Sequence, residues 1–498
     1  MNISQADDTR AHSGRDPHRP AFHFTAPAGW LNDPNGLCQW DGVFHLFYQY
    51  NPDAPVHDRI HWGHATSDDL VHWRDEPIAL TPSSGPDAEG CWSGVLVDDG
   101  GTPTLVYSGY LPSRRPTQAC CIAVGTPDLR CWAKSPENPV IEGPPQGLQV
   151  TELRDHTVWR EAGLWHQAMG SGLVARGGAL LHYRSPDLRR WEYCGPLVTA
   201  DALPAGGPFS GTTWECPDLF RLPLPGGAPH HVLVFSAWDY GRTLYPLYLT
   251  GTLTDGRFVP DGVPRLLDLG LRHFYAPQSF TTADGRRVQF GWAQEARPEA
   301  AVLKDGWSGV MSLPRTLSLG QDGTVAAAPA EEVNSLRLGS GEHLELGEES
   351  VRPGLAGDQL DLVAEVVLPP GGSVEVALRA TGDLREATFV RLERALEGTA
   401  RLVLDRSLSR CAPDATDYDL VELGGELPTL TDDRLSLRII VDHSILEVFA
   451  AGTPLTARVY PADQDATTVQ VTAHGPGTRV TLDLWRMKPA RPAVAALR

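Results

Sequence analysis

The sequence of 498 residues predicts an all-β protein, a five-bladed β-propeller followed by a C-terminal antiparallel β-sandwich. Its 50 glycines and 42 prolines separate short runs of β-branched and aromatic residues, such as VFHLFYQY and HVLVFSAW, while long helical patterns are nearly absent. One motif also recurs 59 residues apart, as SDDLVHW from Ser67, TPDLRCW from Thr126 and SPDLRRW from Ser185. A repeat of this length suits a four-stranded propeller blade.

The expected elements begin with a polar segment, residues 1–20, which holds no apolar run. We expect it to be a mobile arm and not a secretory signal peptide. Residues 21–325 have room for about five blades. Each motif copy is expected to form a hairpin turn capped by its Ser or Thr and its Asp, with its Trp packed between blades. Later turns are expected at LTDGRF (253–258) and TADGRR (282–287).

The composition changes after the propeller. Residues 326–340 are typical of a linker with at most a short helix, and tryptophan becomes scarce. Residues 341–498 contain segments such as SVEVALRA and RLSLRIIVD, in which polar and apolar residues alternate. This period of two predicts an antiparallel β-sandwich as a second domain.

The charge and the cysteines exclude several classes of function. A formal net charge of -20 disfavours nucleic acid and membrane-surface partners, and no apolar run is long enough to span a membrane. The eight cysteines show neither metal-ligand spacing nor a disulfide framework. We therefore expect a cytoplasmic protein with reduced thiols, a neutral substrate, and no metal or organic cofactor.

The run GWLNDPNGL, residues 29–37, is unusual because a carboxylate lies between a Trp-Leu pair and a Pro-Asn-Gly sequence. Such a run is typical of a turn in which Asp33 bonds to the nearby backbone. The alternative is that the turn aims Asp33 into a cavity as a reacting group.

The blade period decides between these two interpretations. At steps of about one blade, Asp33 is followed by Ser93, Asp155, Glu215 and Tyr275, each with aromatic neighbours. First strands of propeller blades line the central channel, so these residues should converge at one end of the axis. Three crowded carboxylates repel one another, and one of them tends to keep its proton. Paired carboxyl groups within aromatic walls are what sugar hydrolysis requires; the aromatic residues in phase are Trp30, Trp92, Trp159 and Trp214.

The motifs WLNDPNG, FYQYNP, HWGHATSDDLVHW, WSG, LRD, WECPDLF, FYAPQ and VDHSILEVF together resemble glycoside hydrolase family 32, the invertases, exo-inulinases and levanases. The resemblance extends over about residues 20–490 and implies the same propeller and sandwich. It implies that Asp33 is the nucleophile, Glu215 the acid/base and Asp155 the transition-state stabiliser. The residues expected to bind the fructosyl unit are Trp30, Leu31, Asn32, Gln49, His57, Trp92, Ser93, Arg154 and Trp292.

Three positions depart from the family pattern, namely His156 after Arg-Asp, His273 before FYAPQ, and Val95 after WSG. The two histidines could reshape the funnel wall. Cys216 could tune the acidity of Glu215 or simply fill space behind the strand. Glu447, in the distal VDHSILEVF motif, is expected to be structural, at the domain interface.

His61 and His64 in HWGHA are expected to be core histidines and not a metal pair, because positions three apart on a strand face opposite sides.

The resulting hypothesis is a retaining β-fructosidase that hydrolyses terminal non-reducing β-D-fructofuranosyl residues of sucrose and short fructans. Alternatives within the enzyme class are an exo-inulinase or levanase, a sucrose-6-phosphate hydrolase and a fructosyltransferase. Outside it, a fructan-binding propeller lectin remains open. A phosphate-specific enzyme should carry a basic cluster on the leaving-group side, and the sequence shows none there. The sequence does not give the oligomeric state.

Overall fold

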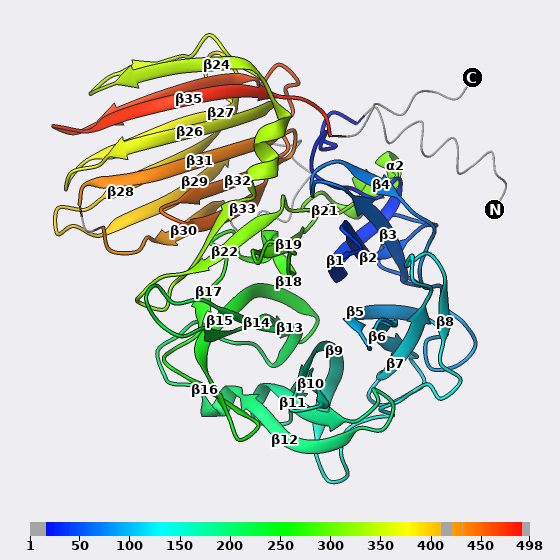
Figure 1. Ribbon diagram of the computed structural model, residues 1–498. Helices are drawn as coiled ribbons and strands as arrows, with labels where there is room; N and C mark the ends of the chain where they lie inside the picture. Colours follow the sequence, from blue (N-terminus) through cyan, green and yellow to red (C-terminus); the bar gives the residue numbers. More distant parts are fainter. Residues whose placement is uncertain (1–15, 410–420, 431, 491–498) are drawn as a thin grey trace, which may run out of the picture.

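Five antiparallel sheets stand in a ring in the computed structural model, which describes residues 16–409, 421–430 and 432–490 (Figure 1). The first strand of each sheet faces the centre of the ring and contacts the first strands of its neighbours, and β18 returns to β1. The predicted five-bladed propeller is therefore confirmed. The strands of the first three blades are β1 (Gly29–Trp40), β2 (Val43–Asn51), β3 (His61–Ser67) and β4 (Trp73–Asp75), then β5 (Gly90–Asp98), β6 (Pro103–Tyr110), β7 (Gln118–Gly125) and β8 (Trp132–Lys134), then β9 (Val150–Glu161), β10 (Leu164–Leu173), β11 (Gly177–Ser185) and β12 (Glu192–Thr199). Those of the last two blades are β13 (Thr213–Leu222), β14 (His230–Asp239), β15 (Arg242–Thr254), β16 (Arg257–Pro260) and β17 (Arg265–Leu266), then β18 (Tyr275–Thr281), β19 (Arg287–Ala293), β21 (Val310–Met311), β22 (Arg315–Leu319) and β23 (Val325–Pro329).

The repeated motif forms the turn between the third and fourth strands of blades 1, 2 and 3. In blade 1, Asp69 N donates to Ser67 Oγ at 3.1 Å and Asp69 Oδ1 accepts from His72 N at 2.8 Å. Trp73 Nε1 donates to the carbonyl of Leu70 at 2.9 Å, and the Trp73 ring lies 5.8 Å from that of Phe290 in blade 5. The expected turn, its cap and the Trp between blades are thus all present.

The later turns only partly follow the expectation. LTDGRF (253–258) joins β15 to β16 and is the equivalent turn of blade 4. TADGRR (282–287) instead joins β18 to β19, the first two strands of blade 5. The prediction for this segment was wrong because an Asp-Gly turn closes any tight hairpin. The equivalent turn of blade 5 is 320–324, and residues 326–340 are divided among β23, η3 (Glu331–Leu336) and β24 (Arg337–Leu346).

Blade 5 also supplies the contact that closes the ring. Between β19 and β22 the chain forms α2 (Glu299–Asp305) and the short strand β20 (Trp307–Ser308). β20 pairs in parallel with the start of β1, where Gly29 N donates to the carbonyl of Gly306 at 2.9 Å. Two further single 3-10 turns lie between blades, η1 (Ala200–Ala202) and η2 (Leu271–His273).

The C-terminal domain is a sandwich of two six-stranded antiparallel sheets, which lies against blade 5 and the chain that connects blade 4 to blade 5 (Figure 1). Its core consists of inward-facing Leu, Val, Ile and Ala side chains, as the alternating pattern predicts. The strands of one sheet are, in spatial order, β24 (Arg337–Leu346), β35 (Arg479–Met487), β26 (Gln359–Val367), β31 (Arg434–Asp442), β32 (Ile445–Ala450) and β33 (Thr453–Arg458). Those of the other are β25 (Ser350–Val351), β34 (Thr468–His474), β27 (Ser373–Ala380), β28 (Ala387–Arg394), β29 (Ala400–Leu408) and β30 (Glu422–Glu426).

The two domains meet around a fully buried group of charges, which we call the interface cluster: His23, Asp268, Arg315, Asp442 and Glu447. Arg315 donates to Glu447 Oε2 at 2.9 Å through Nε and to Asp268 Oδ2 at 2.8 Å through Nη1. Glu447 Oε1 accepts from the backbone N–H of Leu313 at 2.6 Å. The expectation that Glu447 is structural and lies at the domain interface is confirmed.

The N-terminal segment is part of this interface. The backbone N–H groups of Ala21, Phe22 and His23 all donate to the carboxylate of Asp442, at 2.7 to 2.9 Å. Asp16 lies within the expected mobile arm, yet its Oδ2 accepts from Trp307 Nε1 at 2.8 Å and pairs with Arg297. Residues 16–20 are therefore packed between the domains, and residues 1–15 lie outside the described residues.

Two further expectations concern absences. None of the helices in the described part of the chain is long and apolar enough to cross a membrane. The seven cysteines in the same part, which leaves out Cys411, are all free thiols.

Candidate active site

Every first strand changes its pairing register within its first half, at the positions that the blade period singled out. The shifts fall between Leu31 and Pro34 in β1, between Trp92 and Gly94 in β5, at Asp155 in β9, between Glu215 and Asp218 in β13, and between Tyr275 and Gln278 in β18. A bulge leaves a residue unpaired and re-aims its side chain. The bulges thus direct one polar group from each blade to the same end of the axis.

The NDPNG run is one of these bulged segments and not a turn. Residues 29–40 form one continuous strand with two register shifts, Leu31/Pro34 and Asn35/Cys38. Pro34 has no N–H for the ladder, and Gly36 has a φ of +53°, so the local sequence that favours a turn here bends a strand. The expectation of a turn was wrong, although the run does point Asp33 into the funnel.

Asp33 is 8% exposed and is surrounded by uncharged donors. Its Oδ2 accepts from Ser93 Oγ at 2.6 Å and Gln49 Nε2 at 3.1 Å, and it lies 3.4 Å from Cys216 Sγ. Its Oδ1 accepts only from Asn32 Nδ2, at 3.0 Å. Four predicted site residues therefore meet in one contact group, and Oδ1 keeps the larger number of free lone pairs.

Asp155 approaches the same point from blade 3. It is 3% exposed and has a φ of +63°, a conformation that costs a non-glycine residue about 1–2 kcal/mol. Its Oδ2 accepts from Cys216 N at 3.0 Å and lies 3.4 Å from Cys216 Sγ. The Cys216 thiol is thus shared between Asp33 and Asp155, whereas the sequence suggested an effect on Glu215 or simple space filling.

Glu215 is held by two donors at the mouth of the site. Arg154 Nε donates to Oε1 at 2.9 Å and Tyr275 Oη donates to Oε2 at 2.7 Å. Arg154 also pairs with Glu152 at 2.5 Å, and its guanidinium lies 5.1 Å from the ring centroid of Trp238. We call Asp33, Asp155, Glu215 and Arg154 the funnel cluster. It contains three carboxylates and one cation.

Burial and mutual repulsion act on the acidity of this cluster. Burial, followed by the charge of Glu215, raises the pKa of Asp155 to about 7. Burial also raises the pKa of Asp33, although the hydrogen bond from Ser93 opposes the shift. Burial and the surrounding carboxylates raise the pKa of the Cys216 thiol well above its usual range, so it stays protonated. The cluster therefore retains a proton near neutral pH, as the crowding of three carboxyl groups predicts.

Aromatic rings form the wall beside Asp33. Trp30 lies edge-on to His57 at 5.9 Å and to Trp292 at 5.7 Å. His57 also meets Trp92 edge-on at 5.5 Å, and Trp92 stacks on Tyr110 at 4.3 Å. The predicted binding residues Trp30, His57, Trp92 and Trp292 thus form one connected wall.

Two polar atoms near this wall have no hydrogen-bond partner although they are buried. These are Gln49 Oε1 and Trp292 Nε1, one acceptor and one donor. Burying such atoms without a partner costs about 1–3 kcal/mol each, so native proteins retain few of them. Gln49 binds Asp33 through Nε2, so its unpaired Oε1 lies close to Asp33 and is placed to accept from a ligand hydroxyl group.

Some predicted residues lie elsewhere. The Leu31 side chain is fully buried in the apolar core between blades 1 and 5, so it cannot contact a ligand. Trp214 is fully buried and stacks on Phe235, and Trp159 stacks on His166 and His182. In a bulged strand the face of a residue cannot be counted from its position, so the phase match misplaced Trp159 and Trp214, and the resemblance misplaced Leu31.

The departures from the family pattern also lie outside the funnel wall. His156 is 2% exposed and its ring faces Ser108 of blade 2. His273 is 2% exposed. Burial, followed by the charges of Arg406, Arg272 and Arg458, lowers the pKa of His273 well below its usual range. Val95 packs against the core between blades 2 and 3. Neither histidine therefore lines the funnel wall, which the sequence had left open.

Four residues of the site were not assigned a role from the sequence. Tyr275 marks the phase of blade 5, but its hydrogen bond to Glu215 joins residues of two blades and depends on the closed ring. Tyr110 and Trp238 lie at the ends of the second strands of blades 2 and 4. The blade period was applied only to first strands, so it could not identify them. Glu152 stands two residues before Arg154, which is a signal that same-face spacing on a strand could have used.

Of the two histidines predicted to lie in the core, His64 is buried, whereas His61 is only partly buried. His64 Nε2 lies 2.9 Å from His45 Nδ1, and the Phe47 ring stacks on His64 at 4.1 Å. Among the described residues no three His, Cys, Asp or Glu side chains are placed to hold a metal ion.

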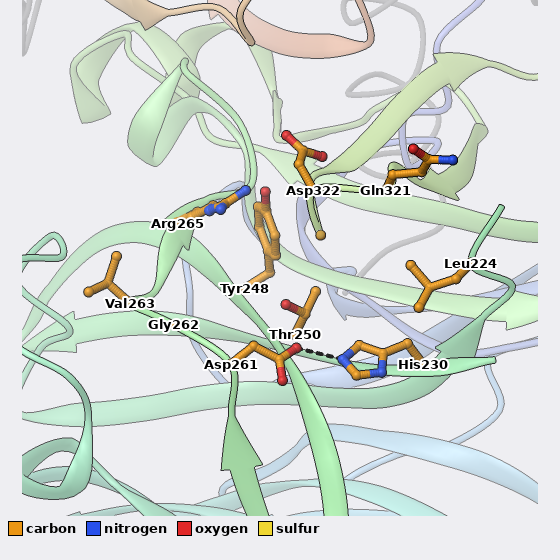
Figure 2. Close-up of a pocket in the computed structure, with 11 residues that line it drawn as sticks. Leu224, His230, Tyr248, Thr250, Asp261, Gly262, Val263, Arg265, Gln321 and Asp322 are labelled. Carbon is orange, nitrogen blue, oxygen red and sulfur yellow. Dashed lines mark hydrogen bonds and ion pairs between the residues drawn. The ribbon is translucent and has the colours of Figure 1, made fainter. Parts of the chain in front are cut away.

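A separate cavity of about 320 Å³ is drawn in Figure 2 with the residues that line it. It is bounded by the outer strands of blade 4 and by the hairpin at residues 321–323 of blade 5. His230 and Asp261 form an ion pair at its edge, 2.5 Å apart, near Arg265 and Tyr248. None of the funnel cluster lines it, so it is separate from the candidate active site.

A propeller whose axis ends in three crowded carboxyl groups, with an aromatic wall and unpaired buried polar atoms, defines the class of glycoside hydrolases. Comparison with known proteins gives the particular family. Residues 23–329 match "Glycosyl hydrolases family 32 N-terminal domain" and residues 331–486 match "Glycosyl hydrolases family 32 C terminal". The chain belongs to glycoside hydrolase family 32, as its motifs predicted.

Several relatives are similar over nearly their whole length. A sucrose-6-phosphate hydrolase from Escherichia coli is 33% identical, covering 94% of each chain. A fructan 6-exohydrolase from Beta vulgaris is 32% identical, covering 96% of this chain and 88% of the relative. The crystal structure of fructan 1-exohydrolase IIa from Cichorium intybus has a TM-score of 0.82 at 28% identity, covering 96% of this chain and 98% of that one.

Proposed function

We propose that the protein is a retaining β-fructosidase that releases the terminal non-reducing β-D-fructofuranosyl unit of sucrose and short fructans. The observation that carries the proposal is the meeting of Asp33, Asp155 and Glu215 at one end of the propeller axis. The shared fold and family with fructan-cleaving and sucrose-cleaving relatives support the substrate class.

In the first step Asp33 attacks the anomeric carbon and the bond to the leaving oxygen breaks, while Glu215 gives its proton to that oxygen. Oδ1 is the attacking atom, because Oδ2 is already bound by Ser93 and Gln49 and Oδ1 accepts only from Asn32. Asp155 binds ring hydroxyl groups and stabilises the oxocarbenium character of the transition state.

The proton must be on Glu215 when the substrate is bound. In the unliganded site burial and repulsion favour a proton on Asp155. Ring hydroxyl groups that donate to Asp155 stabilise its ionised form, so a bound sugar removes the reason for Asp155 to hold a proton. In the second step Glu215 takes a proton from water, whose oxygen attacks the anomeric carbon and frees Asp33.

Substrate hydroxyl groups are matched by polar atoms that lack partners. Gln49 Oε1 can accept and Trp292 Nε1 can donate, while Trp30 and Trp92 offer apolar surface to the sugar. A neutral fructoside suits a funnel in which Arg154 is already paired with Glu152 and Glu215.

A second candidate is hydrolysis of sucrose 6-phosphate, the substrate named for the relative from Escherichia coli. One observation favours it. Arg114 and Arg115 lie in the loop between β6 and β7, which follows Tyr110 of the funnel wall. Arg115 donates to the carbonyl of Pro112 in its own loop, so it must leave that contact to bind a phosphate.

The test is a panel of sucrose, sucrose 6-phosphate, 1-kestose, inulin and levan, with release of fructose as the readout and Asp33→Ala as the control. We expect the highest kcat/KM for sucrose or 1-kestose. A kcat/KM at least tenfold higher for sucrose 6-phosphate, lost in Arg114→Ala/Arg115→Ala, would select the second candidate. Binding of fructans without release of fructose would identify a lectin.

A further inference from the structure

Asp155 carries its carboxylate on a strained, unpaired residue, and such a residue needs contacts that hold it. In β9, Arg154 pairs with Gly170 and His156 with Met169, so Asp155 is the extra residue of the bulge. Its side chain is held from blade 4 by the Cys216 N–H at 3.0 Å. Its main chain is held from blade 2, because Asp155 N donates to Ser108 Oγ at 2.9 Å.

Ser108 has a second partner. His156 Nε2 lies 3.1 Å from the same Ser108 Oγ. Ser108 is fully buried on β6 and His156 is 2% exposed, so water does not compete for either group. The His156 ring and the backbone N–H of Asp155 therefore share one hydrogen-bond partner, the hydroxyl group of Ser108.

The hydrogen atoms can be placed by counting partners. Burial lowers the pKa of His156 to about 3, against hydrogen bonds with the backbone of Tyr107 and the side chain of Gln167, so the ring is neutral and one nitrogen carries a proton. If Nδ1 carries it, Nε2 accepts from the Ser108 hydroxyl group and the hydroxyl hydrogen has a partner. If Nε2 carries it, the Ser108 hydroxyl hydrogen has no partner in this contact. The first arrangement is favoured because it keeps the buried hydroxyl group paired.

Blade 5 offers an internal comparison. Its bulge has Ala276, with a φ of +48°, and Ala276 N donates to Ser236 Oγ of blade 4 at 3.0 Å. Ser236 is the counterpart of Ser108, since both lie on the second strand of the preceding blade. In the described part of the chain no histidine is hydrogen-bonded to Ser236, and the bulge residue Ala276 carries no carboxylate. The contact from a second-strand serine to a bulge therefore occurs in both blades, and His156 adds to it at Asp155.

We propose that Ser108 and His156 are positioning residues for Asp155, with the imidazole orienting the Ser108 hydroxyl so that its oxygen receives the Asp155 N–H. This rests on the proposed role of Asp155 in fructoside hydrolysis. The contact fixes the main chain of the bulge and thereby the depth at which the carboxylate meets the ring hydroxyl groups. Neither residue touches the substrate.

The experiment compares four variants of the full chain with sucrose at 20 °C. Ser108→Ala and His156→Leu each remove one side of the contact, and we expect kcat to fall about threefold to tenfold with KM changed less than twofold. The double variant should be no slower than the slower single variant, because one chain of contacts is broken once. His156→Gln keeps an acceptor near the Nε2 position and should restore most of kcat.

The matched control is His182→Leu, which removes an equally buried histidine that bonds to His166 in the same blade. It should lower Tm while leaving kcat unchanged once the folded fraction is measured by circular dichroism. Full kcat in Ser108→Ala and His156→Leu, additive losses in the double variant, or an equal loss in His182→Leu would each overturn the inference. Wild-type protein that releases no fructose from any sugar would instead overturn the proposed function.

Discussion

The funnel cluster and the interface cluster are both buried groups of carboxylates, and their acidities shift in opposite directions. At the interface Arg315 serves two carboxylates and His23 bridges Asp442 and Glu447. Although burial acts against it, Arg315 and then His23 lower the pKa of Glu447 to about 2. In the funnel one arginine faces three carboxyl groups, and the pKa of Asp155 rises.

The difference shows what each cluster does for the molecule. In the interface cluster every carboxylate oxygen accepts a hydrogen bond. These paired charges hold the two domains together and leave no group free to react. Carboxyl groups without a cationic partner lower the stability of the folded protein. An active site keeps them nevertheless, because its reaction needs a group that transfers a proton and a group whose lone pair attacks. The ratio of carboxylates to cations, and not burial, separates the two clusters.

The largest effect is expected when the nucleophile is removed. Asp33→Ala should lose at least about 10⁴-fold in kcat on sucrose and on a fructoside with a phenol leaving group, because no covalent intermediate forms. The measurement is the burst of phenol release. A burst from this variant would show that the funnel cluster does not act as proposed, and the comparison with the interface would lose its basis.

The next effect separates Glu215 from Asp33 by leaving-group chemistry. Sucrose expels a basic alkoxide, so Glu215→Ala should lose about 10² to 10⁴-fold in kcat on it. The phenol fructoside needs no acid, so the same variant should release one equivalent of phenol quickly and then stall. Added azide should restore turnover. Equal losses on both substrates would mean that the roles of Asp33 and Glu215 are wrongly assigned.

The interface cluster should respond in stability and not in chemistry. Glu447→Gln leaves Arg315 without one of its two buried carboxylate partners, which should lower the free energy of unfolding by about 3–5 kcal/mol. The kcat of the folded variant should match wild type. Urea unfolding measures the first and sucrose hydrolysis the second.

The matched control for Glu447→Gln is Asp68→Asn, which breaks the exposed pair with Arg74. It should leave the free energy of unfolding almost unchanged, because solvent screens an exposed pair. If both variants cost the same, the interface cluster contributes no more than a surface pair.

The smallest effect has the opposite sign. The pKa of Asp155 is raised in the folded state, so the folded protein binds this proton more tightly than the unfolded chain. Its contribution to stability therefore falls as pH rises from about 4, the ordinary pKa of an aspartate, to about 7. Asp155→Asn should be more stable than wild type by on the order of 1 kcal/mol at pH 7.5 and by less at pH 4.

Two further measurements complete this prediction. The kcat of Asp155→Asn should fall far more than its KM rises, because contacts to the ring strengthen in the transition state. For Glu447 the sign reverses: its pKa is lowered, so its contribution is present above about pH 4.5 and is lost as pH falls toward 2. Sucrose hydrolysis measures the change in kcat and KM. Urea unfolding of wild type, Asp155→Asn and Glu447→Gln across pH 2 to 8 measures the two pH dependences of stability, and parallel curves would contradict them.

The sequence reveals the propeller because its turns are local. Ser67, Asp69 and Trp73 bond within one loop, so their spacing survives in the chain as a readable repeat. The same period predicts where Asp33, Asp155 and Glu215 fall, since each blade presents its first strand to the axis. Local rules and a period were enough for the fold and for the three carboxylates.

The rest depends on contacts between blades and between domains. The bulges that aim Asp33 and Asp155 come from packing, and the NDPNG run alone suggests a turn. The Cys216 thiol contacts Asp33 because the closed ring brings blades 1 and 4 together. His23 pairs with Glu447 because the sandwich packs against the propeller. No local pattern encodes partners that lie hundreds of residues apart.

Ring closure also sets an order of events for the growing chain. Blades 1 to 4 are built from consecutive strands, but the seam between blades 1 and 5 joins Gly29 to Trp307 in parallel strands. The loop entropy that such a seam costs rises only with the logarithm of loop length, so distance is no great penalty. Residues 21–23, however, have no carboxylate to bind until Asp442 has been synthesised. Residues 21–23 are thus among the first residues of the propeller to be synthesised and among the last to make their native contacts. The sandwich, which carries Asp442, holds the start of the propeller chain once the ring has closed.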